Sequence, residues 1–177
     1  PPHIEQWMIK DRNGNIPKRK AIKYLSKTKF ILDMQNDLAD GLKIYIVLAS
    51  ENFGRLFKNL VLIKKLGFEK EQYKFLKKLS DDYKLNDIDL DESWGDPKVR
   101  CVLCTSVVAN ALSFELPQFD RIYVYGHSLS NFVREIKQMS ARVRAIRYNE
   151  ICYLPLHRDD NFPCTVEGIK AEINKVL

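Results

Sequence analysis

The feature that most constrains the fold is an apolar run rich in β-branched residues, KIYIVLA, at residues 43–49. Successive side chains of a strand point to opposite faces, so a strand with this sequence is buried on both faces, as in a parallel sheet between two layers of helices. Shorter runs that we also expect to be strands occur at residues 99–104, 121–125 and 151–154. Because helical segments alternate with these runs, the sequence predicts an α/β fold with an open, mostly parallel sheet and helices on both faces.

The first two helices are predicted from apolar residues at helical spacing. One contains Phe30, Ile31, Met34 and Leu38, and Gly41 is expected to end it. Ser50 and Glu51 are expected to begin the second helix. Its apolar positions are Phe53, Leu56, Phe57, Leu60 and Ile63.

The remaining segments give less uniform patterns. Residues 72–76 fit either a strand or the centre of a Lys-rich helix. Residues 81–96 are acidic and are expected to form a loop. A helix is predicted across residues 131–147, and Thr165 is expected to cap a final helix.

The length of 177 residues fits one domain, and 29 Lys and Arg against 23 Asp and Glu give a net charge of +6. The first 29 residues are predicted to be an irregular, basic arm or linker from a preceding domain, and residues 30–177 to be one folded lobe. The first residues lack Met and do not resemble a signal peptide, so the sequence is expected to be part of a longer protein. No apolar run is long enough for a membrane-spanning helix, and no membrane partner is expected.

The four cysteines do not suggest a metal site. Cys101 and Cys104 lie three residues apart in a predicted strand, so their side chains face opposite sides. Cys152 and Cys164 do not form the second CxxC-like knuckle that a zinc site of this kind needs. The sequence favours free, buried thiols in a reducing, intracellular compartment.

Hydroxyl residues follow two of the predicted strands, at the sheet edge where open α/β folds bind ligands. Ser50 follows the first strand, and Thr105 and Ser106 follow the run at 99–104. Hydroxyl and backbone N–H groups at such positions are suited to a phosphodiester backbone. The alternative interpretation of Thr105 and Ser106 is that they are ordinary helix N-cap residues.

A second candidate group lies in the predicted helix at 131–147. Gln138 and Arg142 are i,i+4 neighbours, so an amide and a guanidinium project together and could hold an acidic ligand. Arg144 and Arg147 follow. The alternative interpretation is that these arginines form a solvated helix end stabilised by the helix dipole.

Taken in order, several segments resemble the motifs of the second RecA-like lobe of superfamily 2 helicases. TSVVANALSF at 105–114 resembles motif V, FDRIYVYG follows at 119–126, and QMSARVR at 138–144 resembles motif VI. KIYIVLAS at 43–50 resembles motif IV. The combination of LSF with QMxxRVR is most similar to the origin-binding-protein helicases of herpesviruses and their relatives in other large DNA viruses. The resemblance covers about residues 30–155 and implies a RecA-like sheet.

The resemblance also implies roles for individual residues. In this family the lobe closes on ATP and Mg2+, which an N-terminal lobe mainly holds. Arg142 and Arg144 would be catalytic, neutralising charge on the transferring phosphoryl group. The residues implied to contact the nucleotide are Gln138, Arg142 and Arg147. Those implied to touch the backbone of single-stranded DNA are Ser50, Thr105 and Ser106.

The sequence departs from the family pattern at Ala111 and Ala141, where glycine is usual, and at Ser113, where an acidic residue is usual. Neither a GxxxxGKS/T phosphate loop nor a DExx box occurs in the 177 residues. The chain therefore lacks the nucleotide-gripping half, and neither catalysis nor a bound cofactor is expected from it alone.

The leading hypothesis is the second motor lobe of an ATP-dependent DNA helicase acting in DNA replication, at the host-cell replication site if it is viral. Its expected partners are DNA, the N-terminal lobe and a replication protein such as a primase. The alternative is a degenerate, non-catalytic RecA-like module that binds DNA or such a partner. A third hypothesis is an unrelated flavodoxin-like or nucleotide-sugar domain.

Overall fold

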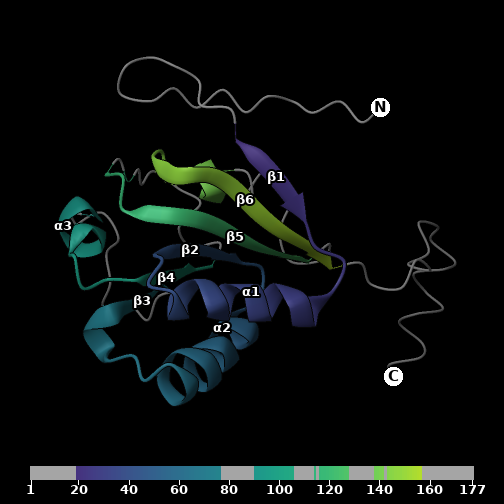
Figure 1. The fold of residues 1–177 in the computed structure, drawn as a ribbon, viewed down its shortest axis with the longest axis horizontal. Coiled ribbons are helices and arrows are strands. Elements are labelled where there is room, and N and C mark those ends of the chain that lie inside the picture. The colour runs from purple at the N-terminus through teal and green to yellow at the C-terminus, as the bar shows by residue number, and fades with distance from the viewer. Residues whose placement is uncertain are drawn as a thin grey trace, which may run out of the picture.

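The computed structural model describes residues 19–76, 90–105, 114, 116–127, 138–141 and 143–156. Within them the chain forms one six-stranded sheet in the order β1-β6-β5-β2-β4-β3 (Figure 1), and every pairing is parallel. The strands are β1 (Lys20–Lys23), β2 (Ile44–Leu48), β3 (Tyr73–Leu76), β4 (Cys101–Cys104), β5 (Phe119–His127) and β6 (Ile146–Leu156). The predicted α/β class with an open parallel sheet is confirmed.

Strand β2 lies inside the sheet, where the KIYIVLA run predicts a strand covered on both faces. It pairs with β5 on one side and with β4 on the other. All five of its residues are buried. Ile44, Ile46 and Leu48 belong to one core cluster, and Tyr45 and Val47 belong to the other.

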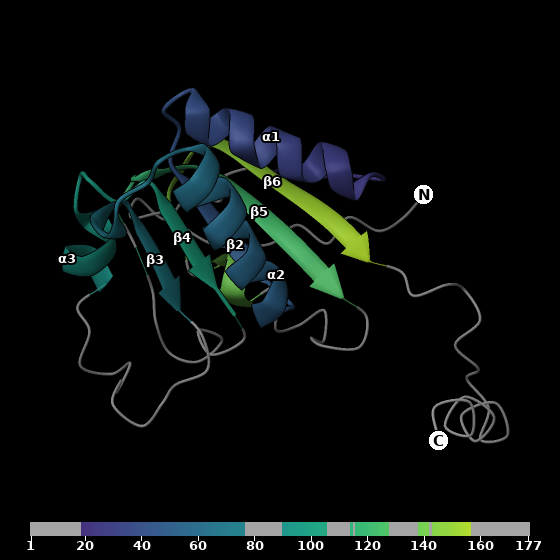
Figure 2. The ribbon, with the colours of Figure 1, turned by 90° about the horizontal axis from the view of Figure 1, so that it is seen from below.

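Helices α1 (Lys27–Ala39) and α2 (Glu51–Phe57) cover one face of the sheet, as Figures 1 and 2 show. Ser26 caps α1 by accepting a hydrogen bond from Lys29 N at 3.3 Å, and Gly41, with φ of +90°, follows its C-terminus as predicted. A π-helix, η1 (Lys58–Lys65), continues α2. A short 3₁₀ turn, η2 (Lys70–Gln72), precedes β3. Residues 73–76 pair with β4, so they form a strand rather than a helix.

The opposite face is covered by a second core cluster. It includes Trp94 of helix α3 (Leu90–Gly95), together with Phe114, Phe119, Met139, Val143 and Ile146. The prediction of a loop at residues 81–96 is therefore wrong for residues 90–95. Trp94 is 1% exposed and packs this helix against the sheet. The loop was predicted from the acidic composition, which gives no sign of this buried side chain. Residues 81–89 lie outside the described residues, as does the final helix predicted after Thr165.

The irregular segment predicted up to residue 29 also needs correction. Residues 20–23 form the edge strand β1, which pairs with β6, and α1 begins at Lys27. Lys20 and Lys23 are exposed, whereas Ile22 packs against the core. An edge strand tolerates charged side chains, so a high lysine content does not exclude a strand. The proposed division of the chain at residue 30 stays a prediction.

The helix predicted across residues 131–147 is shorter within the described residues. Residues 138–141 are helical, but Val143 forms a parallel bridge with Phe114, and β6 begins at Ile146. Arg144 and Arg147 therefore do not lie on a helix. Valine and isoleucine at these positions fit helical spacing and also favour strands, and the pairing with neighbouring segments decides between the two. No helix in the described ranges is long and apolar enough to cross a membrane.

Candidate nucleotide and nucleic-acid site

Ser50 and Thr105 lie at the same edge of the sheet. Strands β2 and β4 are parallel neighbours with Val47 opposite Cys104. Thr105 directly follows Cys104, and Ser50 lies two residues after the end of β2, so both lie where the carboxyl ends of the strands meet. We call Ser50 and Thr105 the hydroxyl edge. Ser106, the third residue predicted here, lies outside the described residues.

The two hydroxyl groups have different surroundings. Ser50 caps α2: its Oγ accepts a hydrogen bond from Phe53 N at 3.3 Å. This contact uses the acceptor side of the hydroxyl and leaves its O–H able to donate. Thr105 is buried. Its N donates to Leu76 O at 3.0 Å and its Oγ1 to the same oxygen at 3.4 Å. Ser50 is therefore the more accessible of the two.

The segments that resemble motifs V and VI are in contact. Phe114 ends the first segment and pairs with Val143 of the second, and Arg144 N donates to Phe114 O at 3.0 Å. The helical turn at 138–141 packs on the second face of the sheet, where Tyr45 Oη donates to Met139 O at 3.3 Å. We call residues 138–147 the arginine segment; Arg142 lies outside the described residues.

The candidate residues of the arginine segment occupy different environments. Gln138 is half-buried in the helical turn, and Arg144 is exposed just after the Val143 bridge. Arg147 is the second residue of β6, where Phe119 of β5 pairs with Ile146, so it lies at the amino edge of the sheet. Arg147 Nη1 is 2.9 Å from Oδ1 of buried Asp120. The expectation that Gln138, Arg144 and Arg147 share one helix is wrong.

Arg19 contacts the arginine segment, a contact that the sequence did not reveal. Its Nη2 donates to Val143 O at 2.8 Å and to Arg144 O at 2.9 Å, and its Nη1 to Ser140 O at 3.4 Å. Burial lowers the pKa of Arg19 to about 10, so the guanidinium stays charged at neutral pH. Arg19 belongs to the stretch predicted to be an irregular arm, and no local pattern marks it.

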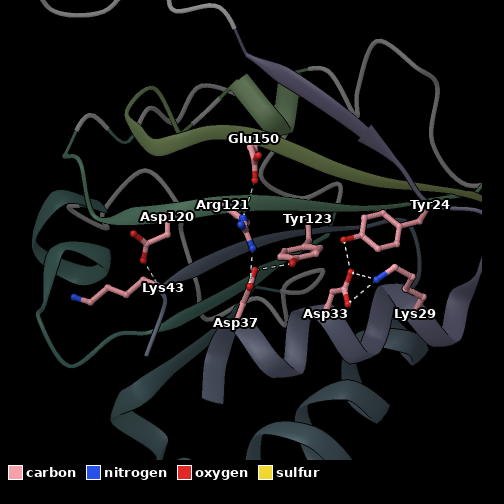
Figure 3. Close-up of polar contacts among 9 residues, drawn as sticks. All are labelled: Tyr24, Lys29, Asp33, Asp37, Lys43, Asp120, Arg121, Tyr123 and Glu150. Carbon is pink, nitrogen blue, oxygen red and sulfur yellow. Dashed lines mark hydrogen bonds and ion pairs between the residues drawn. The ribbon is translucent and has the colours of Figure 1, made fainter. Parts of the chain in front are cut away.

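A second polar network missed by the sequence joins α1 to β5 and β6 (Figure 3). Arg121 Nη1 lies 2.7 Å from Asp37 Oδ1, its Nε donates to Glu150 Oε2 at 2.9 Å, and Tyr123 Oη donates to Asp37 Oδ2 at 2.6 Å. Burial alone would lower the pKa of Arg121, but the hydrogen bond to Asp37 and its charge raise it above the ordinary value. Since these charges are mutually paired, the network joins the layers and is not a ligand site.

The described residues contain no group of three or more His, Cys, Asp or Glu side chains placed to hold a metal ion. Cys101 and Cys104 belong to opposite core clusters, as the strand pattern predicts. Cys101, Cys104 and Cys152 are free and buried.

Comparisons with known proteins identify the fold and not the family. No family model matches the chain, and no curated protein matches its sequence. Among solved structures, the chain is similar to the UvsW helicase from bacteriophage T4, with 13% identity over 88% of this chain and 52% of that chain and a TM-score of 0.49. It is similar to S. cerevisiae Dbp5 bound to RNA and ADP BeF3, with 11% identity over 89% and 44% of the two chains and a TM-score of 0.52. It is also similar to the Sulfolobus solfataricus SWI2/SNF2 ATPase C-terminal domain, with 15% identity over 84% and 53% and a TM-score of 0.43.

The chain therefore spans about half the length of the structures that it matches, 44–53%. At these identities the similarity concerns the fold alone. Together with the all-parallel sheet, the similarity to Dbp5 identifies the fold as a RecA-like α/β fold.

Proposed function

We propose that the chain is the second motor lobe of an ATP-dependent superfamily 2 helicase that acts on DNA during replication. The observation that carries this proposal is the contact between the two motif-like segments. Phe114 and Val143 pair, and Arg144 N bonds to Phe114 O, so the ends of TSVVANALSF and QMSARVR meet in a RecA-like fold. Dbp5, which has a similar fold and is bound to RNA and ADP BeF3 in its structure, supports a lobe that acts with a nucleic acid and a nucleotide. Assignment to the viral origin-binding type rests on the sequence resemblance.

The hydroxyl edge is proposed to contact the backbone of single-stranded DNA. Ser50 and Thr105 lie at the carboxyl edge of adjacent strands, where open α/β sheets bind ligands. The Ser50 hydroxyl can cap α2 through its oxygen and still donate its proton to a phosphate oxygen. Contacts of this kind do not depend on base sequence. Ser106 is included in this proposal from the sequence resemblance.

The arginine segment is proposed to face ATP. A guanidinium is permanently charged and suits phosphate oxygens. Arg142 and Arg144 are proposed, from the sequence resemblance, to act on the transferring phosphoryl group. Gln138 and Arg147 are proposed to support nucleotide binding. Bound ATP supplies the phosphoanhydride that is hydrolysed.

Magnesium is proposed to be held by the N-terminal lobe together with the nucleotide. The part of the chain that the structure describes offers no carboxylate cluster that fits Mg2+. The N-terminal lobe is thus a required partner, and a replication protein such as a primase is a further proposed one. An intracellular, reducing location, the host-cell replication site if the protein is viral, is part of the same proposal.

The proposal is tested by Arg142→Ala in the complete protein that contains both lobes. An arginine that neutralises the transferring phosphoryl group contributes about 10³-fold or more to turnover, so DNA-stimulated ATP hydrolysis should fall by that factor. Circular dichroism should show an unchanged fold. The matched control is Arg55→Ala, which removes an exposed arginine that pairs with Glu51 on α2. ATP turnover that is unchanged in Arg142→Ala would contradict the proposal.

A second function is favoured by the departures from the family motifs at Ala111, Ser113 and Ala141. In this alternative the chain is a non-catalytic RecA-like module that binds DNA or a replication partner. A complete protein that binds DNA but hydrolyses ATP at the same rate with and without it would decide for this alternative, provided that its first lobe is intact.

A further inference from the structure

The outward side of the α2–η1 helix carries apolar residues that the described fold does not bury. Leu56, Leu60 and Ile63 are 59%, 52% and 42% exposed. The inward side supplies Phe53, Phe57, Val61 and Leu62 to the core. In Figures 1 and 2 this helix is the outer layer on its face of the sheet, and no described element covers it. We call Leu56, Leu60 and Ile63 the outer patch.

Two residues of the outer patch, Leu60 and Ile63, lie in the π-helical η1, and Leu56 lies in α2. Of the apolar positions predicted for this helix, Phe53 and Phe57 are buried, whereas Leu56, Leu60 and Ile63 are exposed. In η1 the backbone hydrogen bonds span five residues instead of the four of an α-helix: Leu66 N donates to Val61 O, five residues back, at 2.9 Å. This winding turns Val61 and Leu62 inward and leaves Leu60 and Ile63 outside. Long π-helical segments are rare and often coincide with functional sites.

Exposed single leucines are common, but outward positions on successive turns of a surface helix are normally polar. Here the helix is apolar on two sides, and only one side has a described partner. A helix with this pattern indicates that a second surface packs against it.

The charges around the outer patch are positive. Residues 51–65 contain Arg55, Lys58, Lys64 and Lys65 against Glu51 alone. Glu51 pairs with Arg55 at 2.7 Å. Lys58, Lys64 and Lys65 form no ion pair with any residue in the described ranges. The patch is therefore an apolar surface with a basic border.

We propose that the outer patch docks an acidic amphipathic helix of a partner protein. The apolar side of that helix would cover Leu56, Leu60 and Ile63, and its carboxylates would meet Lys58, Lys64 and Lys65. A second copy of this chain fits less well, because two basic borders would face each other. A nucleic acid would meet the lysines but leave the leucines exposed to water. Since the arginine segment packs on the opposite face of the sheet, docking here leaves that segment uncovered.

The test uses two labelled synthetic peptides of about 16 residues, long enough for four helical turns. Both have leucines at i, i+3, i+4 and i+7; one has glutamates on the flanking positions and the other has lysines. Fluorescence anisotropy should show binding of the acidic peptide and not of the basic one. Leu60→Asp and, separately, Lys64→Glu should each weaken binding of the acidic peptide by about tenfold or more.

Leu25→Asp is the matched control, because Leu25 is 90% exposed and lies before α1, outside the α2–η1 helix; its binding should equal that of the unchanged chain. All three replaced side chains are exposed, so the variants should fold. Equal binding of both peptides, no binding of the acidic peptide, or full binding by Leu60→Asp would overturn the proposal. So would dimerisation of the chain in sedimentation velocity that Leu60→Asp abolishes, because the patch would then be filled by a second copy.

Discussion

At the scale of single residues, Arg19 determines the backbone of the arginine segment. Its guanidinium reaches the carbonyl oxygens of Ser140, Val143 and Arg144. Carbonyl groups at the end of a helical turn have no partner within the helix, and a buried carbonyl without a partner is costly. A guanidinium presents five N–H donors in a fixed plane, so one side chain can serve several carbonyls at once. Arg19 therefore acts as a long-range cap.

Arg19→Gln should loosen this segment. Hydrogen bonds to a charged group are each worth about 1.5–3 kcal/mol, and glutamine cannot span the same three carbonyls. We expect the Arg144 amide, which donates to Phe114 O, to exchange its hydrogen about tenfold faster or more, as measured by NMR. The control is Arg55→Gln, whose exposed pair with Glu51 should contribute little. Unchanged protection of the Arg144 amide would contradict the cap.

The positions of Ser50 and Thr105 could be predicted, because residues after parallel strands gather at one edge. The contact of Arg19 could not, since it joins residues 121 or more positions apart. The positions of Arg144 and Arg147 were predicted wrongly, because local spacing does not show that Val143 pairs with Phe114. The contact of Arg19 and the positions of Arg144 and Arg147 both depend on contacts between residues that are far apart in the sequence.

At the scale of elements, α2 approaches the sheet closely at Gly54. A Cβ atom at this position would lie 2.6 Å from Leu48 Cδ1 and 2.8 Å from Phe75 Cζ. Gly54 is buried, so β2 and β3 both limit the space there. The glycine thus sets how near the helix packs.

Gly54→Ala should destabilise the fold. Alanine favours a helix over glycine by about 1 kcal/mol, but overpacking a buried contact costs about 1–3 kcal/mol, so we expect a net loss of about 1 kcal/mol in the free energy of unfolding. Urea denaturation measures it. Asn52→Ala, at an exposed position of the same helix, should change stability by less than about half that amount. A Gly54→Ala protein more stable than the original would contradict the close contact.

Helices and strands whose sequence pattern lies within the element itself could be predicted. Strand β2 and helix α1, with its terminal Gly41, agree with their patterns. Strand β1 was missed because an edge strand needs only one inward apolar residue, Ile22, and its lysines suggest a loop. The exposure of Leu60 and Ile63 could not be predicted from helical spacing, because these residues lie in the π-helical η1, whose winding depends on how the helix fits the sheet.

At the scale of the whole molecule, the parallel sheet is buried on both faces, and the thiols share that burial. Cys101 and Cys152 lie in the core cluster beneath α1 and α2, and Cys104 lies in the opposite one. Burial raises the pKa of Cys104 to about 12 and that of Cys152 to about 11, and it raises that of Cys101 as well. The fold therefore keeps these three thiols neutral. As a result, the free energy of unfolding should decrease when the pH becomes alkaline.

Stability should be constant with respect to these thiols below about pH 9, because both the folded and the unfolded chain keep the thiol protons there. Above that pH the unfolded chain loses them and the folded chain does not, so the free energy of unfolding falls until the folded pKa is reached. For Cys152, raised from 9.0 to about 11, the loss at pH 10 is about 1.4 kcal/mol. Urea denaturation under reducing conditions at pH 8, 9 and 10 measures the slope. Cys152→Ala lowers stability at every pH through the cavity it leaves, but it should flatten the fall between pH 9 and 10; an identical slope in both proteins would show that this thiol titrates alike in the two states.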